Sequence, residues 1–347
     1  MTKVAIIIPT MNRPDFILRQ LRFYDLVNSP HPVYLSDSSN EENAEKLKQG
    51  LKEIKKFTVV YQWAPPGKDH LHALLPLVEE SYCLQMGDDD LMIPKTISAC
   101  ADFLEEHLDY ATCAGKQVDV RFRTEDYNKP YGLVDRQTRP LGRSIEHKDM
   151  LARLRDFWSD PPFICFAVRR IEIEKKIRNA TKHFSLMERF LEVLLWSILA
   201  MAGKAKTIDE LGYIMQISNN RCFSTELAVD FMLGPATKEK WDICQNGLSE
   251  LLREGGISLE ESQNVAKWIF ILYLARNFTY ETSWRSYGYA KPESIKPETS
   301  KKIRNFAAHL PLLKKMYYQF KPPQDVTRPE SKYFNDFKMV KEFLESR

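Results

Sequence analysis

Val4-Ala5-Ile6-Ile7-Ile8, close to the amino end, is an unbroken apolar run made mostly of β-branched residues. Runs of this kind are typical of strands that are buried on both faces of a parallel sheet. Pro9 closes the run, and beyond Pro14 apolar residues recur at helical spacing. The amino end therefore predicts a buried strand that leads into an amphipathic helix.

The same alternation of strand and helix continues to about residue 115. Further strands are predicted at 32–35, 57–63, 82–86 and 110–114, and helices at 44–54, 71–78 and 95–107. Strands that alternate with amphipathic helices favour βαβ units. We therefore expect an α/β fold with a mostly parallel sheet, helices on both of its faces, and ligands at the carboxyl ends of the strands.

The rest of the chain departs from this pattern. Residues 116–160 are rich in arginine, proline and glycine and predict a long, partly irregular insertion, which a strand at 163–168 follows. A long helix is predicted over 185–202. Beyond residue 220 only helical periodicity remains, over 236–254, 258–280 and 299–319. The sequence thus predicts two parts, an α/β domain at 1–220 and a mainly helical region at 221–347.

Composition argues against several classes of protein. Lys and Arg number 50 and Asp and Glu 47, a net charge of +3 without long blocks of like charge, so no nucleic-acid partner is expected. The six cysteines form no C-x-x-C pair, which favours a reducing compartment. No apolar run approaches the roughly 20 residues of a transmembrane helix. We expect a cytoplasmic protein, and the basic, aromatic segment 312–320 adds the expectation of peripheral contact with the inner face of a membrane.

Three consecutive carboxylates, Asp88-Asp89-Asp90, follow the strand at 82–86. Like charges so close together repel each other unless a cation neutralises them, and oxygen ligands suit Mg²⁺ or Mn²⁺. If strand geometry persists, Asp88 and Asp90 lie on one side and Asp89 on the other. A metal site and a solvated turn that caps the next helix both stay open at this point.

Glycine-rich phosphate loops are missing, since neither G-x-G-x-x-G nor G-x-x-x-x-G-K-[ST] follows the first strand. This disfavours dinucleotide dehydrogenases and P-loop enzymes. Any diphosphate must then be held by a metal ion and by side chains such as Arg13 or Lys68.

Three segments in series carry a family resemblance: residues 7–14 (IIPTMNRP), 35–39 (LSDSS) and 84–90 (LQMGDDD). Over about residues 1–215 the chain resembles the amino-terminal half of family 2 glycosyltransferases with the GT-A fold. The resemblance implies that residues 1–220 form a nucleotide-sugar-binding catalytic domain. The residues that it implies at the nucleotide sugar are Pro9, Thr10, Arg13, Asp37, Lys68, Asp88 and Asp89. Of the aspartates, it implies Asp90 first and Asp88 next as ligands of Mn²⁺ or Mg²⁺.

The chain departs from the family where the catalytic base is expected. The family's Glu-Asp pair has no literal counterpart in residues 185–192 (SLMERFLE), which offer the single acids Glu188 and Glu192. Glu188 lies in the first turn of the predicted helix, and Glu192 follows one turn later on the same face. Both stay candidates for the base.

The function implied by the resemblance is transfer of a sugar from a nucleotide-diphosphate donor, expected to be a UDP-sugar, to a hydroxyl of a glycan, a lipid-linked molecule or a protein, with inversion. The metal would act as a Lewis acid and a carboxylate would take the acceptor proton. Acceptor binding is assigned to residues 116–160 and the helical region, where Trp158 could stack on a sugar ring. Two alternatives stay open: a nucleotidyltransferase of related fold, and an inactive protein that binds a nucleotide sugar or a glycan.

Overall fold

The computed structural model of the chain describes residues 2–65, 70–123, 129–138, 140–162, 164–182, 184, 189–217, 234–235, 237–286 and 325–346. The strands are β1 (Val4–Thr10), β2 (Val33–Asp37), β3 (Val59–Trp63), β4 (Tyr82–Gln85), β5 (Leu91–Met92), β6 (Tyr110–Phe122), β7 (Val134–Gln137), β8 (Val168–Arg170) and β9 (Lys204–Gln216). The helices are α1 (Pro14–Leu26), α2 (Glu41–Leu51), α3 (His70–Leu74), the short 3-10 helix η1 (Leu75–Leu77), α4 (Pro94–Glu106), α5 (Met150–Ser159), α6 (Ile171–Thr181), α7 (Arg189–Ala202), α9 (Thr237–Glu254), α10 (Leu259–Ser286) and α13 (Phe334–Glu345).

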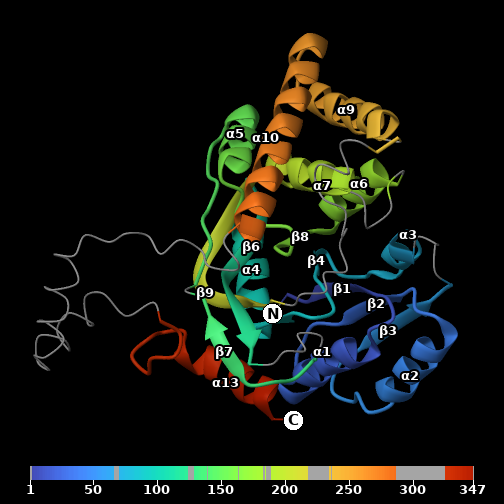
Figure 1. Cartoon of the computed structure of the whole chain (residues 1–347), viewed down its shortest axis with the longest axis vertical. Coiled ribbons are helices and arrows are strands. Elements are labelled where there is room, and N and C mark those ends of the chain that lie inside the picture. Colours follow the sequence, from blue (N-terminus) through green and yellow to red (C-terminus); the bar gives the residue numbers. More distant parts are fainter. Residues whose placement is uncertain are drawn as a thin grey trace, which may run out of the picture.

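The described strands form one sheet in the order β3-β2-β1-β4-β8-β6-β9-β5, and β7 pairs with β6 (Figure 1). The strands β1 to β4 run parallel, and so do the long neighbours β6 and β9. The short strands β8, β5 and β7 are antiparallel to their partners. In register, Thr10 lies beside Asp37, and Asp37 lies beside Trp63. The carboxyl ends of β1, β2 and β3 therefore meet at one edge of the sheet.

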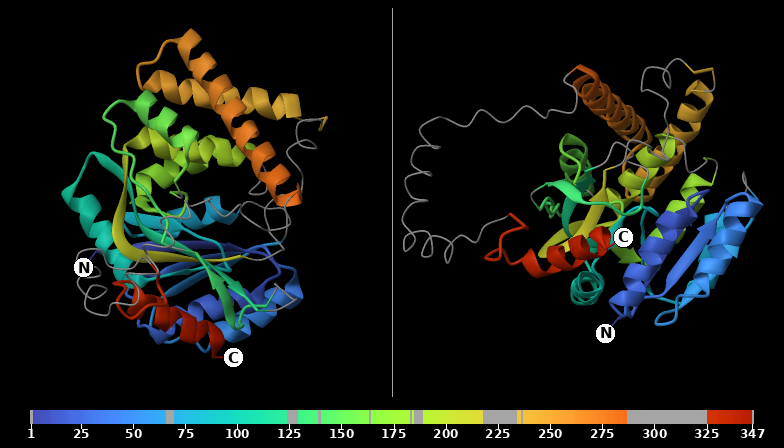
Figure 2. Two further views of the ribbon diagram at one scale, coloured as in Figure 1. Left: turned by 60° about the vertical axis from the view of Figure 1, so that its left-hand side comes forward. Right: turned by 60° about the horizontal axis from the view of Figure 1, so that its bottom comes forward.

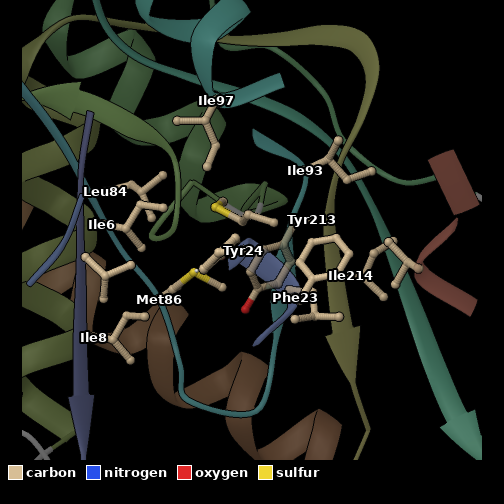
Figure 3. Packing of buried hydrophobic residues seen from close by; sticks show 14 of the residues in the cluster. Ile6, Ile8, Phe23, Tyr24, Leu84, Met86, Ile93, Ile97, Tyr213 and Ile214 are labelled. Atoms are coloured by element: carbon tan, nitrogen blue, oxygen red, sulfur yellow. Dashed lines mark hydrogen bonds between the residues drawn. The ribbon is translucent and has the colours of Figure 1, made fainter. Parts of the chain in front are cut away.

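The two faces of β1 lie against different sets of helices. Ile6 and Ile8 belong to a buried cluster with residues of α1, α4, β9 and α13, and Figure 3 shows both beside Leu84 and Met86. Ile7 belongs to another cluster, formed mainly with α3 and the start of α6. Because both faces are covered, β1 needs apolar residues throughout, which explains its unbroken apolar sequence.

Local signals in the sequence explain where the helices begin. Pro14 occupies the first turn of α1 and Pro94 that of α4, positions at which the missing N–H of proline costs no hydrogen bond. The side chain of Asn40 caps α2 by accepting a hydrogen bond from the N–H of Asn43. Ser258 does the same for α10, where its Oγ accepts from the N–H of Glu261 at 3.3 Å.

A second core lies among the helices α5, α6, α7, α9 and α10, which stack on one side of the sheet (Figures 1 and 2). Trp158 of α5 is buried there at 3% exposure, and its indole contacts Trp196 and Tyr273. The helix α13 lies instead with the sheet, where Phe337 and Leu344 join the cluster of β1. The helical part of the chain thus contributes to both cores.

The structure confirms the predicted fold class, a mixed α/β fold with a mostly parallel sheet, helices on both faces and helices α9 and α10 in the carboxyl third. The prediction of a partly irregular insertion at 116–160 was wrong in part, because β6 extends to Phe122 and both β7 and α5 follow. Within that stretch Val118, Val120 and Phe122 alternate with polar residues and are buried, which is a strand pattern that the many arginines obscured. The strand predicted at 163–168 begins only at Val168.

No helix within the described ranges is both long and apolar enough to cross a membrane. The proposed surface segment at 312–320 and the helix predicted at 299–319 lie outside the described residues.

His31 gives the fold an expected dependence on pH. Its ring is fully buried, Nδ1 accepts a hydrogen bond from the N–H of Val4 at 3.2 Å, and Nε2 lies 3.1 Å from the carbonyl oxygen of Pro94. Burial lowers the pKa of His31, so the unfolded chain takes up a proton first as the pH falls. We expect the free energy of unfolding to decline below about pH 6.5.

Urea unfolding at pH 7.5 and pH 5.5 measures this decline. His31→Gln should reduce the difference between the two pH values, whereas a matched change at the exposed His107 should leave it as in the unmodified protein. An equal difference in all three proteins would show that His31 is not the group responsible.

Candidate functional site

The residues that the sequence assigns to a nucleotide sugar meet in part at the carboxyl edge of β1 and β4. Thr10, the last residue of β1, donates a hydrogen bond from Oγ1 to Asp88 Oδ2 at 2.7 Å. Arg13 follows in the loop after β1 and donates from Nη1 to Asp88 Oδ1 at 2.6 Å and from Nη2 to Asp89 Oδ2 at 3.0 Å. Four side chains, from the end of β1 and from the loops that follow β1 and β4, are thus joined by direct contacts.

The position of Arg13 is fixed by the start of α1. Pro14 begins this helix, and the carbonyl of Arg13 accepts the first backbone hydrogen bonds, from Phe16 and Ile17. The guanidinium lies 4.1 Å from the centre of the Phe16 ring, within the range of a cation–π contact. The Arg13 side chain is 16% exposed, so it reaches the surface of the edge while contacting both aspartates.

The three aspartates have different surroundings. The Asp88 side chain is 6% exposed and that of Asp89 is 21% exposed. Burial raises the pKa of Asp88 to about 6, although the positive charge of Arg13 acts in the opposite direction. Asp89 is therefore the most accessible of the three aspartates.

Asp90 is engaged within the protein through both carboxylate oxygens. Its Oδ2 accepts a hydrogen bond from the hydroxyl of Tyr213, and its Oδ1 accepts one from the N–H of Gln216 at 2.9 Å. Burial and the neighbouring charge of Asp89 raise the pKa of Asp90, against the effect of these hydrogen bonds. A metal ion at Asp90 would compete with the contacts to β9, and one at Asp88 would compete with Thr10 and Arg13, so the geometry favours Asp89 over the residue that the sequence placed first.

Arg19 and Gln20 of α1 lie beneath the loop and were missed from the sequence. Arg19 is fully buried and donates to the carbonyl oxygens of Asp89 and Pro130 and to Gln216 Oε1. Gln20 Nε2 donates to the carbonyl oxygens of Gly87 and Asp90, at 3.0 and 2.9 Å. Their helical spacing was a usable signal, because both fall between Phe16 and Phe23 on the stripe that faces the core.

Asp37 is fully buried at the end of β2. Its Oδ2 accepts a hydrogen bond from the hydroxyl of Tyr61 at 2.8 Å, and its Oδ1 accepts one from the N–H of Ser39 at 2.8 Å. The loops after β1 and β2 are also joined to each other, since the N–H of Asn12 donates to Ser39 Oγ at 2.7 Å. Asp37 therefore links the end of β2 to β3 and to the loop after β2, while its contact with a nucleotide stays a prediction.

The chemistry of the donor set suits a hard divalent cation, since Asp88 and Asp89 offer oxygens next to each other on one loop. The arrangement does not by itself hold an ion: among the described residues no group of three His, Cys, Asp or Glu side chains is placed to do so. Two carboxylates together with phosphate oxygens and water are the usual surroundings of Mg²⁺. The two carboxylates thus fit a cation that also binds phosphate oxygens, in place of the contacts that they make with Arg13.

The remaining predicted site residues take no part in these contacts or fall outside the described residues. Glu188 and Lys68 are outside the described residues. Glu192, in the first turn of α7, accepts a hydrogen bond from the hydroxyl of Tyr273 of α10 at 2.9 Å. Trp158 donates its indole N–H to Ser197 Oγ at 3.3 Å in the helical core, so its ring packs against protein and is not exposed for a sugar. Pro9 lies within β1 beside Ser36 of β2.

A separate hollow of about 420 Å³ lies between α5 and the first turns of α10. Its lining combines the apolar side chains of Leu154, Val265 and Trp268 with the polar side chains of Arg155 and Asn264. These residues come from the two parts of the chain, 116–160 and the helical carboxyl region, to which the sequence assigns acceptor binding.

Comparison with known proteins gives structural likenesses only. No family model matches the chain, and no curated protein matches it. A crystal structure of S. aureus TarS 1-349 in complex with UDP has a TM-score of 0.44 and 12% identity, covering 100% of this chain and 91% of that one. Another crystal structure of TarS 1-349 has a TM-score of 0.41 and 14% identity, covering 84% of this chain and 93% of that one. The complex of TarS 1-349 with UDP-GlcNAc has a TM-score of 0.39 and 12% identity, covering 82% of this chain and 92% of that one. At this level of likeness neither activity nor ligand carries over to the chain.

Proposed function

We propose that the protein is a glycosyltransferase that takes a sugar from a nucleotide-diphosphate donor in the presence of Mn²⁺ or Mg²⁺. The observation that carries the proposal is the direct contact of Arg13 with Asp88 and Asp89 at the carboxyl edge of β1 and β4. These residues belong to two of the three segments with the family 2 resemblance, and they are 75 and 76 positions apart in the sequence. Open α/β sheets bind ligands at this edge.

The roles of the residues follow from their chemistry. Arg13 offers a planar guanidinium, which suits the oxygens of a diphosphate. Asp88 and Asp89 would hold the divalent cation, which when bound would neutralise negative charge on the leaving diphosphate. Arg19 and Gln20 hold the backbone of the aspartate loop from below, so that the carboxylates of Asp88 and Asp89 keep their direction.

The proposed catalytic base is Glu188. Glu192, the other candidate, accepts a hydrogen bond from Tyr273 within the helical layer, and a general base must be able to reach the acceptor hydroxyl. Acceptor binding is placed in the helical layer, where the hollow between α5 and α10 offers an indole, a guanidinium and a side-chain amide. Contact with a membrane surface through 312–320 stays a prediction from the sequence.

A screen of nucleotide sugars tests the proposal. Thermal unfolding is recorded with UDP-, GDP- and dTDP-sugars, each with Mn²⁺ and with EDTA, and release of the free nucleoside diphosphate is measured in parallel. Stabilisation by one donor together with release of its diphosphate supports a glycosyltransferase. Release of pyrophosphate from a nucleoside triphosphate would instead indicate a nucleotidyltransferase. Stabilisation without release in the presence of varied hydroxyl acceptors would indicate a binding protein.

A further inference from the structure

We propose that Arg13 is an internal competitor of the divalent cation: it binds Asp88 and Asp89 when no cation is bound, and moves to the donor diphosphate when the cation takes its place. This inference rests on the proposed function and concerns the order in which charges exchange at the site. It makes the binding of the cation and that of the donor depend on each other, because the donor diphosphate gives the displaced guanidinium a new partner of opposite charge.

The contact geometry supports competition at this place. One guanidinium spans both carboxylates, with Nη1 at 2.6 Å from Asp88 Oδ1 and Nη2 at 3.0 Å from Asp89 Oδ2. The second oxygen of Asp88 accepts a hydrogen bond from Thr10. Both oxygens of Asp88 and one oxygen of Asp89 are therefore engaged within the protein, so a cation held by these two aspartates would compete with Arg13 for them.

Two arginines contact the aspartate loop, and they differ in burial and in the atoms that they bind. Arg19 is fully buried, and its guanidinium is fixed by three acceptors: the carbonyl oxygens of Asp89 and Pro130 and the side chain of Gln216. Arg13 lies at the rim with 16% of its side chain exposed, resting on the ring of Phe16. We assign the fixed positive charge to Arg19 and the exchangeable one to Arg13.

The size of the effect follows from the charges. A cation that enters beside Arg13 meets a like charge, and it must also break two charge-assisted hydrogen bonds. Couplings between two binding events of this kind usually change an affinity by about 5- to 150-fold. We therefore expect removal of the Arg13 charge to tighten the binding of Mn²⁺ alone by about tenfold or more.

The test measures Mn²⁺ binding without nucleotide, by calorimetry or by the electron paramagnetic resonance signal of free Mn²⁺. Arg13→Gln should bind Mn²⁺ about tenfold more tightly than the unmodified protein. Arg22→Gln is the matched control, since Arg22 lies on α1, the helix that follows Arg13, and pairs with the exposed Glu53 at 2.8 Å. It should bind Mn²⁺ as the unmodified protein does. Arg13→Lys, which keeps the charge and cannot span both aspartates, should fall between the two and covers the case in which Arg13→Gln does not fold.

The outcomes separate the two proposals. Unchanged or weaker Mn²⁺ binding in Arg13→Gln, or in Arg13→Lys if only that variant folds, would overturn the competition, whatever the unmodified protein does with UDP. A gain that persists in Arg13→Gln combined with Asp89→Asn would also overturn it, because the ion would then bind elsewhere. A gain that Asp89→Asn abolishes supports the competition. Absence of UDP binding by the unmodified protein in the presence of Mn²⁺ would instead count against the proposed function alone.

Discussion

Replacing Glu174 with glutamine should lower the free energy of unfolding by about 3 to 5 kcal/mol, because it removes the only carboxylate from a buried ionic cluster that the structure describes around two arginines. Glu174 Oε2 accepts from Arg169 Nε at 2.8 Å, and its Oε1 accepts from Arg178 Nε at 2.6 Å. All three side chains are buried. Without the carboxylate, two guanidinium charges stay inside the protein and repel each other.

Urea unfolding measures this loss, and Asp242→Asn is the matched control. Asp242 pairs with Lys238 on the exposed side of α9 at 3.0 Å, and loss of such a pair should cost less than about 1 kcal/mol. The cluster also predicts a pH dependence. Burial raises the pKa of Glu174, but the charges of Arg169 and Arg178 outweigh it and hold that pKa at about 2.

The folded pKa of Glu174 thus lies below the usual value of about 4.3 in an unfolded chain. Its contribution to stability is complete above that value and is lost as the pH falls toward 2. Equal stability of Glu174→Gln and the unmodified protein at neutral pH would show that the cluster is not a net stabilising element.

Replacing Glu188 with glutamine should lower kcat by about two to four orders of magnitude with little change in donor affinity, because a proposed general base acts on the acceptor proton. The amide has nearly the same shape as the carboxylate and cannot take a proton. Initial rates under saturating donor and acceptor measure kcat, and binding of the donor measures its affinity separately.

Glu192→Gln is assayed beside it, together with the surface control Asp242→Asn. A loss confined to Glu192→Gln would assign the base to Glu192 and would mean that Tyr273 orients it. Near-normal kcat in both glutamine variants would exclude both glutamates as the catalytic base. The inverting mechanism expected from the sequence would then have no candidate base.

The sheet was largely predictable because its strands carry their signal locally. β1 is apolar throughout since helices cover both of its faces, and the alternation of strands with amphipathic helices follows from the same burial. The predicted helix starts lie within a few residues of the observed ones, and proline at the starts of α1 and α4 and the Asn40 cap of α2 explain where these helices begin. The convergence of Thr10, Arg13 and Asp88 also followed, because the carboxyl ends of parallel strands share one edge.

The different surroundings of the three aspartates were not predictable, because the partners of Asp90 lie far away in the chain. Asp90 is bound by Tyr213 and Gln216, 123 and 126 positions later, and β9 carries no local sign of this contact. The cluster around Glu174 is different, because Arg169 and Arg178 lie only five positions before it and four positions after it, and what the sequence did not show is that all three side chains are buried. Trp158 shows the opposite error: an aromatic residue near several arginines suggested a sugar contact, yet the helices around α5 bury it.

The most direct test of a donor site at Asp88 and Asp89 is calorimetric titration of UDP into the unmodified protein, Asp89→Asn and Asp242→Asn, each with Mn²⁺ and with EDTA. We predict that UDP binds the unmodified protein and Asp242→Asn in the presence of Mn²⁺, that EDTA weakens this binding, and that Asp89→Asn loses at least about tenfold, or 1.4 kcal/mol. Thermal unfolding of each variant shows that it is folded. Binding of UDP that is equal in all three proteins and unaffected by EDTA would contradict the account.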